Sequence, residues 1–275
     1  MQGIKLLALD VDGTLVPYAN AQVAEADANA IRRAQAAGVI VTLATGRLYN
    51  IARRWIRQFQ MDGPIISING ADVRTRDESV YADRMDLELV KEWLETYRNS
   101  GIHRFISAEN MVYYTEDDHF LELERRWDHG YMGKCPVTVL KTDKQLIEAI
   151  SEVRVQKCMA WVPGPEYCAK LEALAQPYRK VFSVVRGDPC NLEFTCKGTS
   201  KGRALERLAE YYGFDIAETM AIGDSGNDVQ MLRAAGIGVA MGNAMHETLD
   251  AADYVTADVD HGGIAQAIEK FILKN

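Results

Sequence analysis

Two aspartates, Asp10 and Asp12, follow a hydrophobic run that ends at Leu9, and a Gly-Thr turn comes directly after them. Like charges this close repel each other, and a buried carboxylate without a partner costs free energy. Residues two apart on a strand can project to the same side, so both carboxylates can face one point. A cation between them would stabilise this arrangement.

A second pair of acidic residues follows a later strand-like run, "TMAIG", which ends at Gly223. In an open parallel sheet, ligands bind beyond the carboxyl ends of the strands. We therefore expect the two pairs of aspartates to converge there around one metal ion. The predicted metal ligands are Asp10, Asp12, Asp224 and Asp228.

The donor types indicate which ion would bind. All four side chains offer oxygen, and none of these segments contains His or Cys, which favours Mg²⁺ over zinc or copper. Mg²⁺ usually binds a substrate phosphate together with one or two carboxylates. The phosphate would need donors, which the backbone of the Gly13 turn, the Thr45 hydroxyl and a lysine can supply. Lys201 is preferred over Lys197 because it opens a predicted helix.

Carboxylates beside a phosphate can carry out phosphoryl transfer. Asp10, at the strand end, is the predicted nucleophile that attacks phosphorus and forms an aspartyl-phosphate. Asp12 is the predicted general acid/base, which protonates the leaving alkoxide and later deprotonates the attacking water. The metal ion and Lys201 would neutralise the charge on the transferring group.

The elements that must position these residues form two blocks of alternating strands and helices. The first block has strands over 4–11, 39–46 and 64–71, with a helix that ends at Gly38. The same alternation returns after residue 200. Near-continuous Val, Ile and Leu strands between amphipathic helices predict an α/β fold, with one parallel sheet covered by helices on both faces.

Between the two blocks the sequence is more polar, and its helices and short strands predict an α+β insertion. The expected domains are therefore a core over 1–83 and 191–275 and an insertion over 84–190. Two adjacent linkers would form a natural hinge between them.

The composition excludes some classes of partner. The chain has 275 residues and a formal net charge of -8, so nucleic acid and anionic membranes are not expected partners. Five cysteines without a C-x-x-C motif, and no apolar run near the length of a membrane span, predict a cytoplasmic protein with reduced thiols. The expected partner is a small-molecule phosphate ester. The chain itself is expected to be a monomer or a homodimer.

Four motifs of this sequence resemble the four motifs of the haloacid dehalogenase-like hydrolase superfamily and occur in the same order. They are "DVDGTL" from Asp10, "ATGR" ending at Arg47, Lys201 in "SKG", and "GDSGND" from Gly223. The "TGR", the "NGA" from Asn69 and the large insertion resemble its Cof-type phosphatase branch. The resemblance implies a Rossmann-like, three-layer core with an inserted cap, Mg²⁺ dependence and phosphatase activity on small phosphorylated metabolites.

By matching position, the resemblance implies Asp10, Asp12 and Lys201 as catalytic residues, with Asp224 as a direct metal ligand and Asp228 binding directly or through water. The predicted substrate- and phosphate-binding residues are Thr45, Gly46, Arg47, Asn69 and Asn227.

Several alternatives stay open at this point. Arg47 is equally consistent with an exposed cation at a helix start, and Asn69 with a simple turn residue. Asn227 is expected to bond the phosphoryl group or to orient Lys201. A phosphomutase, or a sensor that binds a phosphometabolite without turnover, are the alternative functions.

Overall fold

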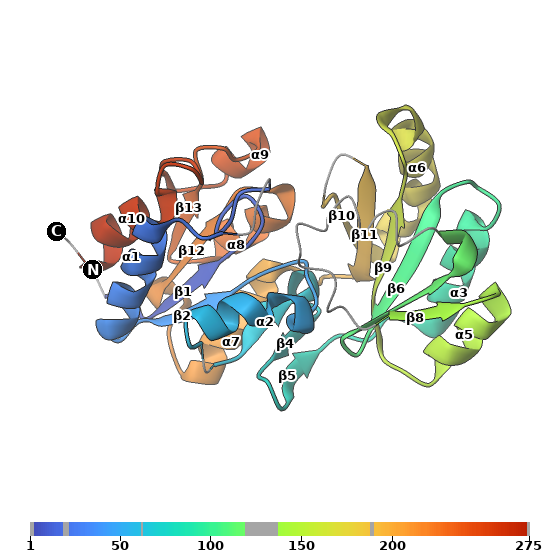
Figure 1. The fold of residues 1–275 in the computed structure, drawn as a ribbon, viewed down its shortest axis with the longest axis horizontal. Helices are drawn as coiled ribbons and strands as arrows, with labels where there is room; N and C mark the ends of the chain where they lie inside the picture. The colour runs from blue at the N-terminus through green and yellow to red at the C-terminus, as the bar shows by residue number, and fades with distance from the viewer. Residues whose placement is uncertain (1–2, 19–21, 62, 119–136, 188–189, 274–275) are drawn as a thin grey trace. The chain divides into compact units, whose positions relative to one another are not determined.

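A computed structural model describes residues 3–18, 22–61, 63–118, 137–187 and 190–273 (Figure 1). The chain divides into two compact units. Unit 1 comprises Met1–Arg47, Ala52–Tyr81 and Ser200–Asn275, and unit 2 comprises Leu48–Ile51 and Ala82–Thr199.

The described part of unit 1 is built on a five-stranded parallel sheet in the order β14-β13-β12-β1-β2. The central strand, β1, pairs with strands from both ends of the sequence, since Leu6 lies opposite both Ile40 and Thr219. All four of its side chains are buried, as expected for a parallel sheet covered on both faces. The strands are β1 (Leu6–Leu9), β2 (Ile40–Leu43), β12 (Thr219–Gly223), β13 (Ile237–Ala240) and β14 (Tyr254–Val255).

Helices cover this sheet in two groups. Leu6 and Ala8 pack against α7 and α8, and the alternation of side chains along β1 turns Leu7 and Leu9 to the opposite face. The helices α1 and α10 pack against each other as the second group (Figure 1). The predicted three-layer α/β fold is confirmed. The helices of unit 1 are α1 (Glu25–Ala36), α7 (Lys201–Tyr212), α8 (Val229–Ala234), α9 (His246–Leu249) and α10 (Gly263–Ile268), while α2 (Tyr49–Gln58) begins in unit 2 and ends in unit 1.

The third predicted strand departs from the main sheet. β3 (Ile65–Ser67) pairs antiparallel with β4 (Asp72–Arg74), which continues to β5 (Ser79–Ala82) in a small three-stranded sheet. A single bridge between Ala44 and Ile66 connects β3 to the end of β2. The expected strand over 64–71 therefore stops at Ser67, because a 3-10 turn follows it.

Unit 2 contains, among its described residues, a six-stranded mixed sheet in the order β10-β11-β9-β6-β7-β8. Its core includes an aromatic cluster in which Trp93 and Tyr97 contact Phe194. The predicted α+β character of the insertion is observed. The elements are α3 (Leu87–Tyr97), β6 (His103–Ala108), β7 (Met111–Thr115), β8 (Val137–Leu140), α5 (Asp143–Ser151), β9 (Val155–Trp161), α6 (Cys168–Ala175), β10 (Phe182–Val185) and β11 (Asn191–Cys196).

The end of the insertion differs from the expected boundary at residue 191. β11 pairs with β9 and β10, so its residues belong to the sheet of unit 2, and the chain returns to unit 1 at Ser200. The alternating polar and apolar residues of β11 do not indicate which sheet it joins, because that choice depends on partners distant in sequence.

Two further expectations concern membrane-spanning helices and the state of the cysteines. No helix in the described ranges is long and apolar enough to cross a membrane. The cysteines that the structure describes, Cys158, Cys168, Cys190 and Cys196, are free thiols. Cys135 lies outside the described residues.

Candidate active site

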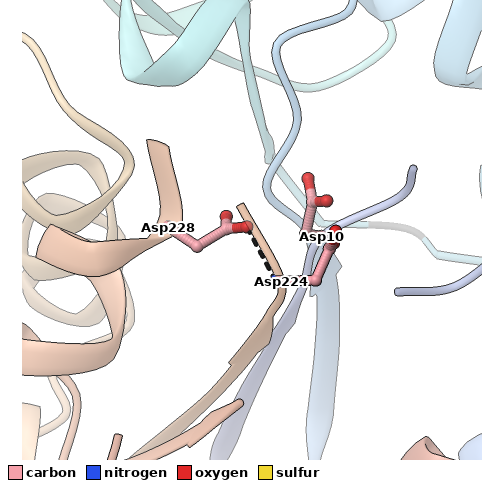
Figure 2. A group of neighbouring side chains, drawn as sticks. All are labelled: Asp10, Asp224 and Asp228. Atoms are coloured by element: carbon pink, nitrogen blue, oxygen red, sulfur yellow. Dashed lines mark hydrogen bonds between the residues drawn. The ribbon is translucent and has the colours of Figure 1, made fainter. Parts of the chain in front are cut away.

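Three buried carboxylates meet at the carboxyl ends of β1 and β12 (Figure 2). Asp10 follows β1 and is tied to β12 by a 3.0 Å bond from its backbone N–H to the carbonyl of Ile222. Asp224 follows β12, and Asp228 lies in the 3-10 turn that leads into α8. Each of the three offers an oxygen within 4.8 Å of the other two. The predicted convergence of Asp10, Asp224 and Asp228 is therefore present in the structure.

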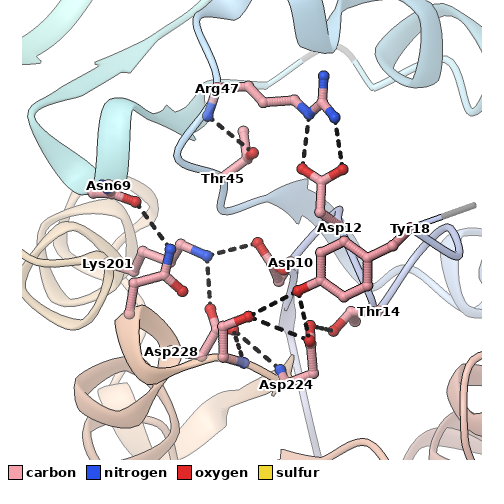
Figure 3. Close-up of polar contacts among 12 residues, drawn as sticks. Asp10, Asp12, Thr14, Tyr18, Thr45, Arg47, Asn69, Lys201, Asp224 and Asp228 are labelled. Carbon is pink, nitrogen blue, oxygen red and sulfur yellow. Dashed lines mark hydrogen bonds and ion pairs between the residues drawn. The ribbon is translucent and has the colours of Figure 1, made fainter. Parts of the chain in front are cut away.

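Lys201 is the cation beside these carboxylates (Figure 3). Its ammonium donates to Oδ1 of Asp10 at 2.6 Å and to Oδ1 of Asp228 at 2.7 Å. Ser200 caps the N-terminus of α7 by accepting the backbone N–H of Arg203, and this places Lys201 in the first turn. Lys197, the alternative lysine, instead donates to the backbone oxygen of Arg179.

The cluster has more negative than positive charge. Burial, and next the charge of Asp228, raise the pKa of Asp10 well above its usual value, and the same causes raise the pKa of Asp224 to about 6. Burial alone would lower the pKa of Lys201, but the two carboxylates outweigh it and raise that pKa. Three carboxylates facing one ammonium leave two charges uncompensated, which one divalent cation would balance.

Asp228 also organises the loop that carries Asp224. Its Oδ2 accepts the backbone N–H groups of Asp224 and Ser225, both at 3.0 Å, while its Oδ1 binds Lys201. Asp228 therefore has fewer free lone pairs than Asp10, whose Oδ2 accepts no hydrogen bond from the described residues. Its main contacts hold the lysine and the loop in place.

Asp12 lies apart from the three clustered carboxylates and binds Arg47 (Figure 3). The guanidinium donates Nε–H to Oδ2 of Asp12 at 2.7 Å and an Nη2–H to Oδ1 at 2.6 Å. Such a two-pronged pair fixes the orientation of the carboxylate as well as its position. The side chains of Asp12 and Arg47 are only 32% and 18% exposed. The side chain of Asp12, expected among the metal ligands, thus faces a guanidinium.

The loop after β2 and the turn after β3 are joined by backbone hydrogen bonds. The N–H of Asn69 donates to the carbonyl of Thr45 at 3.0 Å, and Thr45 Oγ1 accepts the N–H of Arg47 at 3.1 Å, with Gly46 between them. Asn69 has a positive φ of 56°, which is strained for a residue with a side chain. These contacts hold the predicted phosphate-binding segments together within unit 1.

Asn227 contacts this turn through its side chain. Its amide donates to Oδ1 of Asn69 at 3.2 Å, while its own buried Oδ1 has no hydrogen-bond partner in the described part of the chain. Asn69 and Asn227, predicted separately from two motifs, are therefore brought into direct contact.

The structure adds four residues that were not predicted for the site. Thr14, Tyr18 and Ser225 bond the carboxylate of Asp224, and Asn243 donates to the carbonyl of Gly13 at 2.8 Å. Thr14 and Ser225 stand inside the quoted motifs, so their positions could have suggested a role. No local pattern marks Tyr18 or Asn243, because their contacts depend on the fold.

Gly13 must be glycine at its position in this turn. Its φ is +83°, and a Cβ there would lie 2.3 Å from Oδ2 of Asp224. The backbone can therefore approach the acidic cluster only without a side chain.

A comparison with known proteins identifies the family. Residues 7–268 match the model of the haloacid dehalogenase-like hydrolases. The chain belongs to this family. The predicted family and enzyme class are thereby confirmed, and its relatives place it with the phosphatases of that family.

The relatives resemble the chain over almost all of its length. YxeH of Bacillus subtilis (strain 168), named a putative phosphatase, is 30% identical over 277 residues, which cover 98% of each protein. YitU of the same organism, named a 5-amino-6-(5-phospho-D-ribitylamino)uracil phosphatase, is 27% identical over 273 residues, 97% of each protein. A solved structure described as the HAD subclass IIB sugar phosphatase BT4131 has a TM-score of 0.84 and 26% identity, and covers 97% of this chain and 98% of that one.

Proposed function

We propose that this protein is a Mg²⁺-dependent phosphatase that hydrolyses small phosphorylated metabolites through an aspartyl-phosphate at Asp10. The observation that carries the proposal is the state of the Asp10 carboxylate. One oxygen is held by the ammonium of Lys201, and the other accepts no hydrogen bond from the described residues. A buried, oriented carboxylate with one uncommitted oxygen suits nucleophilic attack on phosphorus.

The residues present fit a divalent cation. Asp10 and Asp224 would hold it, and Asp228 would act directly or through water. All three offer oxygen donors, and the cluster lacks two positive charges. When bound, the ion would withdraw electron density from the phosphoryl oxygens and hold the substrate phosphate. The carboxylate of Asp12 is bound to Arg47 and lies outside the three clustered carboxylates. Asp12 would therefore contribute through proton transfer, not as a side-chain ligand of the metal ion.

The first chemical step is derived from the positions of the side chains. Asp10 attacks phosphorus, forming an O–P bond while the bond from phosphorus to the leaving oxygen breaks. Asp12 gives its proton to that oxygen, which then departs as an alcohol. Lys201 stabilises the charge that develops on the phosphoryl oxygens. Each oxygen of Asp12 accepts one N–H of Arg47, which leaves each a second lone pair in the carboxylate plane for the proton.

The second step returns the enzyme to its starting state. Asp12, now a carboxylate, takes a proton from a water molecule as that water attacks phosphorus. The bond between Asp10 and phosphorus breaks, and inorganic phosphate is released. The carboxylate of Asp10 is regenerated beside Lys201 for the next cycle.

Sugar phosphates and phosphorylated cofactors or nucleotides are the substrate classes we propose. The support comes from relatives named as a sugar phosphatase and as a phosphatase of a ribityl-linked uracil. We also propose that unit 2 selects the leaving group, as expected for a domain inserted into a catalytic core. Thr45, Gly46, Asn69 and Asn227 are proposed to line the phosphate site, since their segments are joined by hydrogen bonds.

The test is phosphate release from a panel of sugar phosphates, nucleotides, FMN and pyridoxal phosphate, with Mg²⁺ or with EDTA. The wild type is compared with Asp10→Asn and with the matched control Asp27→Asn, which alters another buried aspartate that accepts the N–H of Ala265 in unit 1. We expect Mg²⁺-dependent release that falls by roughly 10³-fold or more in Asp10→Asn and stays near the wild-type rate in Asp27→Asn.

Release that survives in Asp10→Asn would contradict the assignment of the nucleophile. Stable substrate binding without turnover by the wild type would instead indicate a sensor. Slow hydrolysis that a bisphosphate accelerates would indicate a phosphomutase.

A further inference from the structure

Both carboxylate oxygens of Asp224 are held by hydroxyl groups (Figure 3). Thr14 Oγ1 donates to Oδ1 at 2.8 Å. The Tyr18 hydroxyl donates to Oδ2 at 3.0 Å, and Ser225 Oγ donates to the same oxygen at 3.2 Å. The two hydroxyls are themselves 3.1 Å apart, and because each has one proton, donation by both to Oδ2 leaves neither to donate to the other.

The number of lone pairs distinguishes the two oxygens. A carboxylate oxygen accepts about two hydrogen bonds in its plane. Oδ2 already accepts two, from Tyr18 and Ser225, whereas Oδ1 accepts one, from Thr14. A cation can therefore bind Asp224 through Oδ1, and two hydroxyls compete with it at Oδ2.

This asymmetry affects two common divalent cations differently. Mg²⁺ is small and demands near-octahedral coordination, whereas Ca²⁺ takes six to eight oxygens and accepts carboxylates that bind with both oxygens. A carboxylate that offers one oxygen suits Mg²⁺. A carboxylate that offers both gives Ca²⁺ an additional ligand.

We propose that Tyr18 is a positioning residue that, together with Ser225, occupies Oδ2 of Asp224 and so makes the site favour Mg²⁺ over Ca²⁺. This inference rests on the proposed function, because it takes Asp224 as a metal ligand. It assigns a role to a side chain outside the four motifs.

The surroundings of Tyr18 support a role that depends on its hydroxyl. The residue is 53% exposed, yet its hydroxyl bonds two residues of the buried loop after β12. Core packing therefore does not account for its position.

The experiment is calorimetric titration of the metal-free protein with Mg²⁺ and, separately, with Ca²⁺. The variants are Tyr18→Phe and the matched control Tyr211→Phe, which removes a phenol hydroxyl from another half-exposed tyrosine. Changes in groups that orient a metal ligand typically alter affinity by about 10- to 100-fold. In Tyr18→Phe we expect the Kd for Mg²⁺ to rise by about 10-fold while the Kd for Ca²⁺ stays or falls. Tyr211→Phe should match the wild type.

The ratio of the two Kd values decides the outcome. An unchanged ratio in Tyr18→Phe, including equal weakening of both ions, would overturn the inference, because a purely structural role predicts it. Ser225→Ala removes the other donor to Oδ2 and should shift the ratio in the same direction. It provides the test if Tyr18→Phe does not fold. Absence of Mg²⁺ binding in the wild type would instead contradict the proposed metal site itself.

Discussion

Replacing Arg47 by alanine would test whether this residue acts on Asp12 or on the substrate phosphate. Arg47 makes two charge-assisted hydrogen bonds to Asp12, at 2.7 and 2.6 Å, and both side chains are partly exposed to solvent. Bonds to charged groups contribute about 1.5–3 kcal/mol each when buried, and solvent exposure reduces this considerably. We take about 1.4 kcal/mol as the positioning free energy, which corresponds to about a tenfold change in rate.

The assay compares two substrates with different leaving groups. An alkyl phosphate needs a proton from Asp12 on its leaving oxygen, whereas 2,4-dinitrophenyl phosphate releases a stable phenolate without one. We expect Arg47→Ala to lower kcat/KM, which covers the steps up to departure of the leaving group, about tenfold on the alkyl phosphate and to have little effect on kcat/KM for the aryl phosphate. Asp12→Asn should show the same selectivity with a larger loss, about 10²- to 10⁴-fold.

Arg54→Ala is the matched control, because the Arg54 and Arg47 guanidiniums stack on the same ring, that of Trp55. It should leave both rates near the wild-type values. An equal loss on both substrates in Arg47→Ala would refute the reasoning and show that Arg47 binds the phosphoryl group. In the Asp12→Asn background, Arg47→Ala should add little further loss, since coupled residues are not additive.

Two predictions concern the acidic cluster. Gly13→Ala places a Cβ 2.3 Å from Oδ2 of Asp224, whereas Gly38→Ala has a similar φ of +88° and no atom within 4 Å. In urea unfolding, each variant should lose about 1–2 kcal/mol of its free energy of unfolding because of backbone strain. Only Gly13→Ala should also weaken Mg²⁺ binding, and an unchanged Mg²⁺ affinity in that variant would contradict the predicted clash. In EDTA, stability should fall as pH rises from 4 to 7, because the pKa of Asp224 is raised from 3.8 to about 6 and the native state binds that proton more tightly. The free energy of unfolding should fall by up to about 3 kcal/mol over this range, and by less when Mg²⁺ is present. A flat profile in EDTA would contradict the raised pKa of Asp224.

The acidic cluster was largely predictable from the sequence, because strand ends in a parallel sheet share one edge. Asp10 and Asp224 each follow a hydrophobic run directly, and β1 and β12 are neighbours in the sheet. Lys201 was predictable from its place at a helix start. The motifs fix these positions locally, and the fold only has to bring the strand ends together.

The remaining parts depend on contacts between distant segments. The bond between Tyr18 and Asp224 joins residues 206 positions apart, and no periodicity encodes it. The pairing of Arg47 with Asp12 was not foreseen, because a cation after a strand suits solvent, phosphate or carboxylate equally well. β11 likewise carries no local mark of the sheet it joins, and only its ladders with β9 and β10 assign it to unit 2.

The pairing of β1 with β12 has a consequence for the order of events during synthesis. β1 is made within the first ten residues, but its partner on one side begins at Thr219. Most of unit 2, from Ala82 to Thr199, is a continuous segment that is complete before that partner leaves the ribosome. The inserted unit can therefore fold while β1 is paired with β2 but still lacks β12, and Asp10 meets Asp224 only when nearly the whole chain has been translated. An N-terminal fragment ending before β12 would carry Asp10, the proposed nucleophile, without Asp224 and Asp228, so we expect premature termination to yield no partially active enzyme.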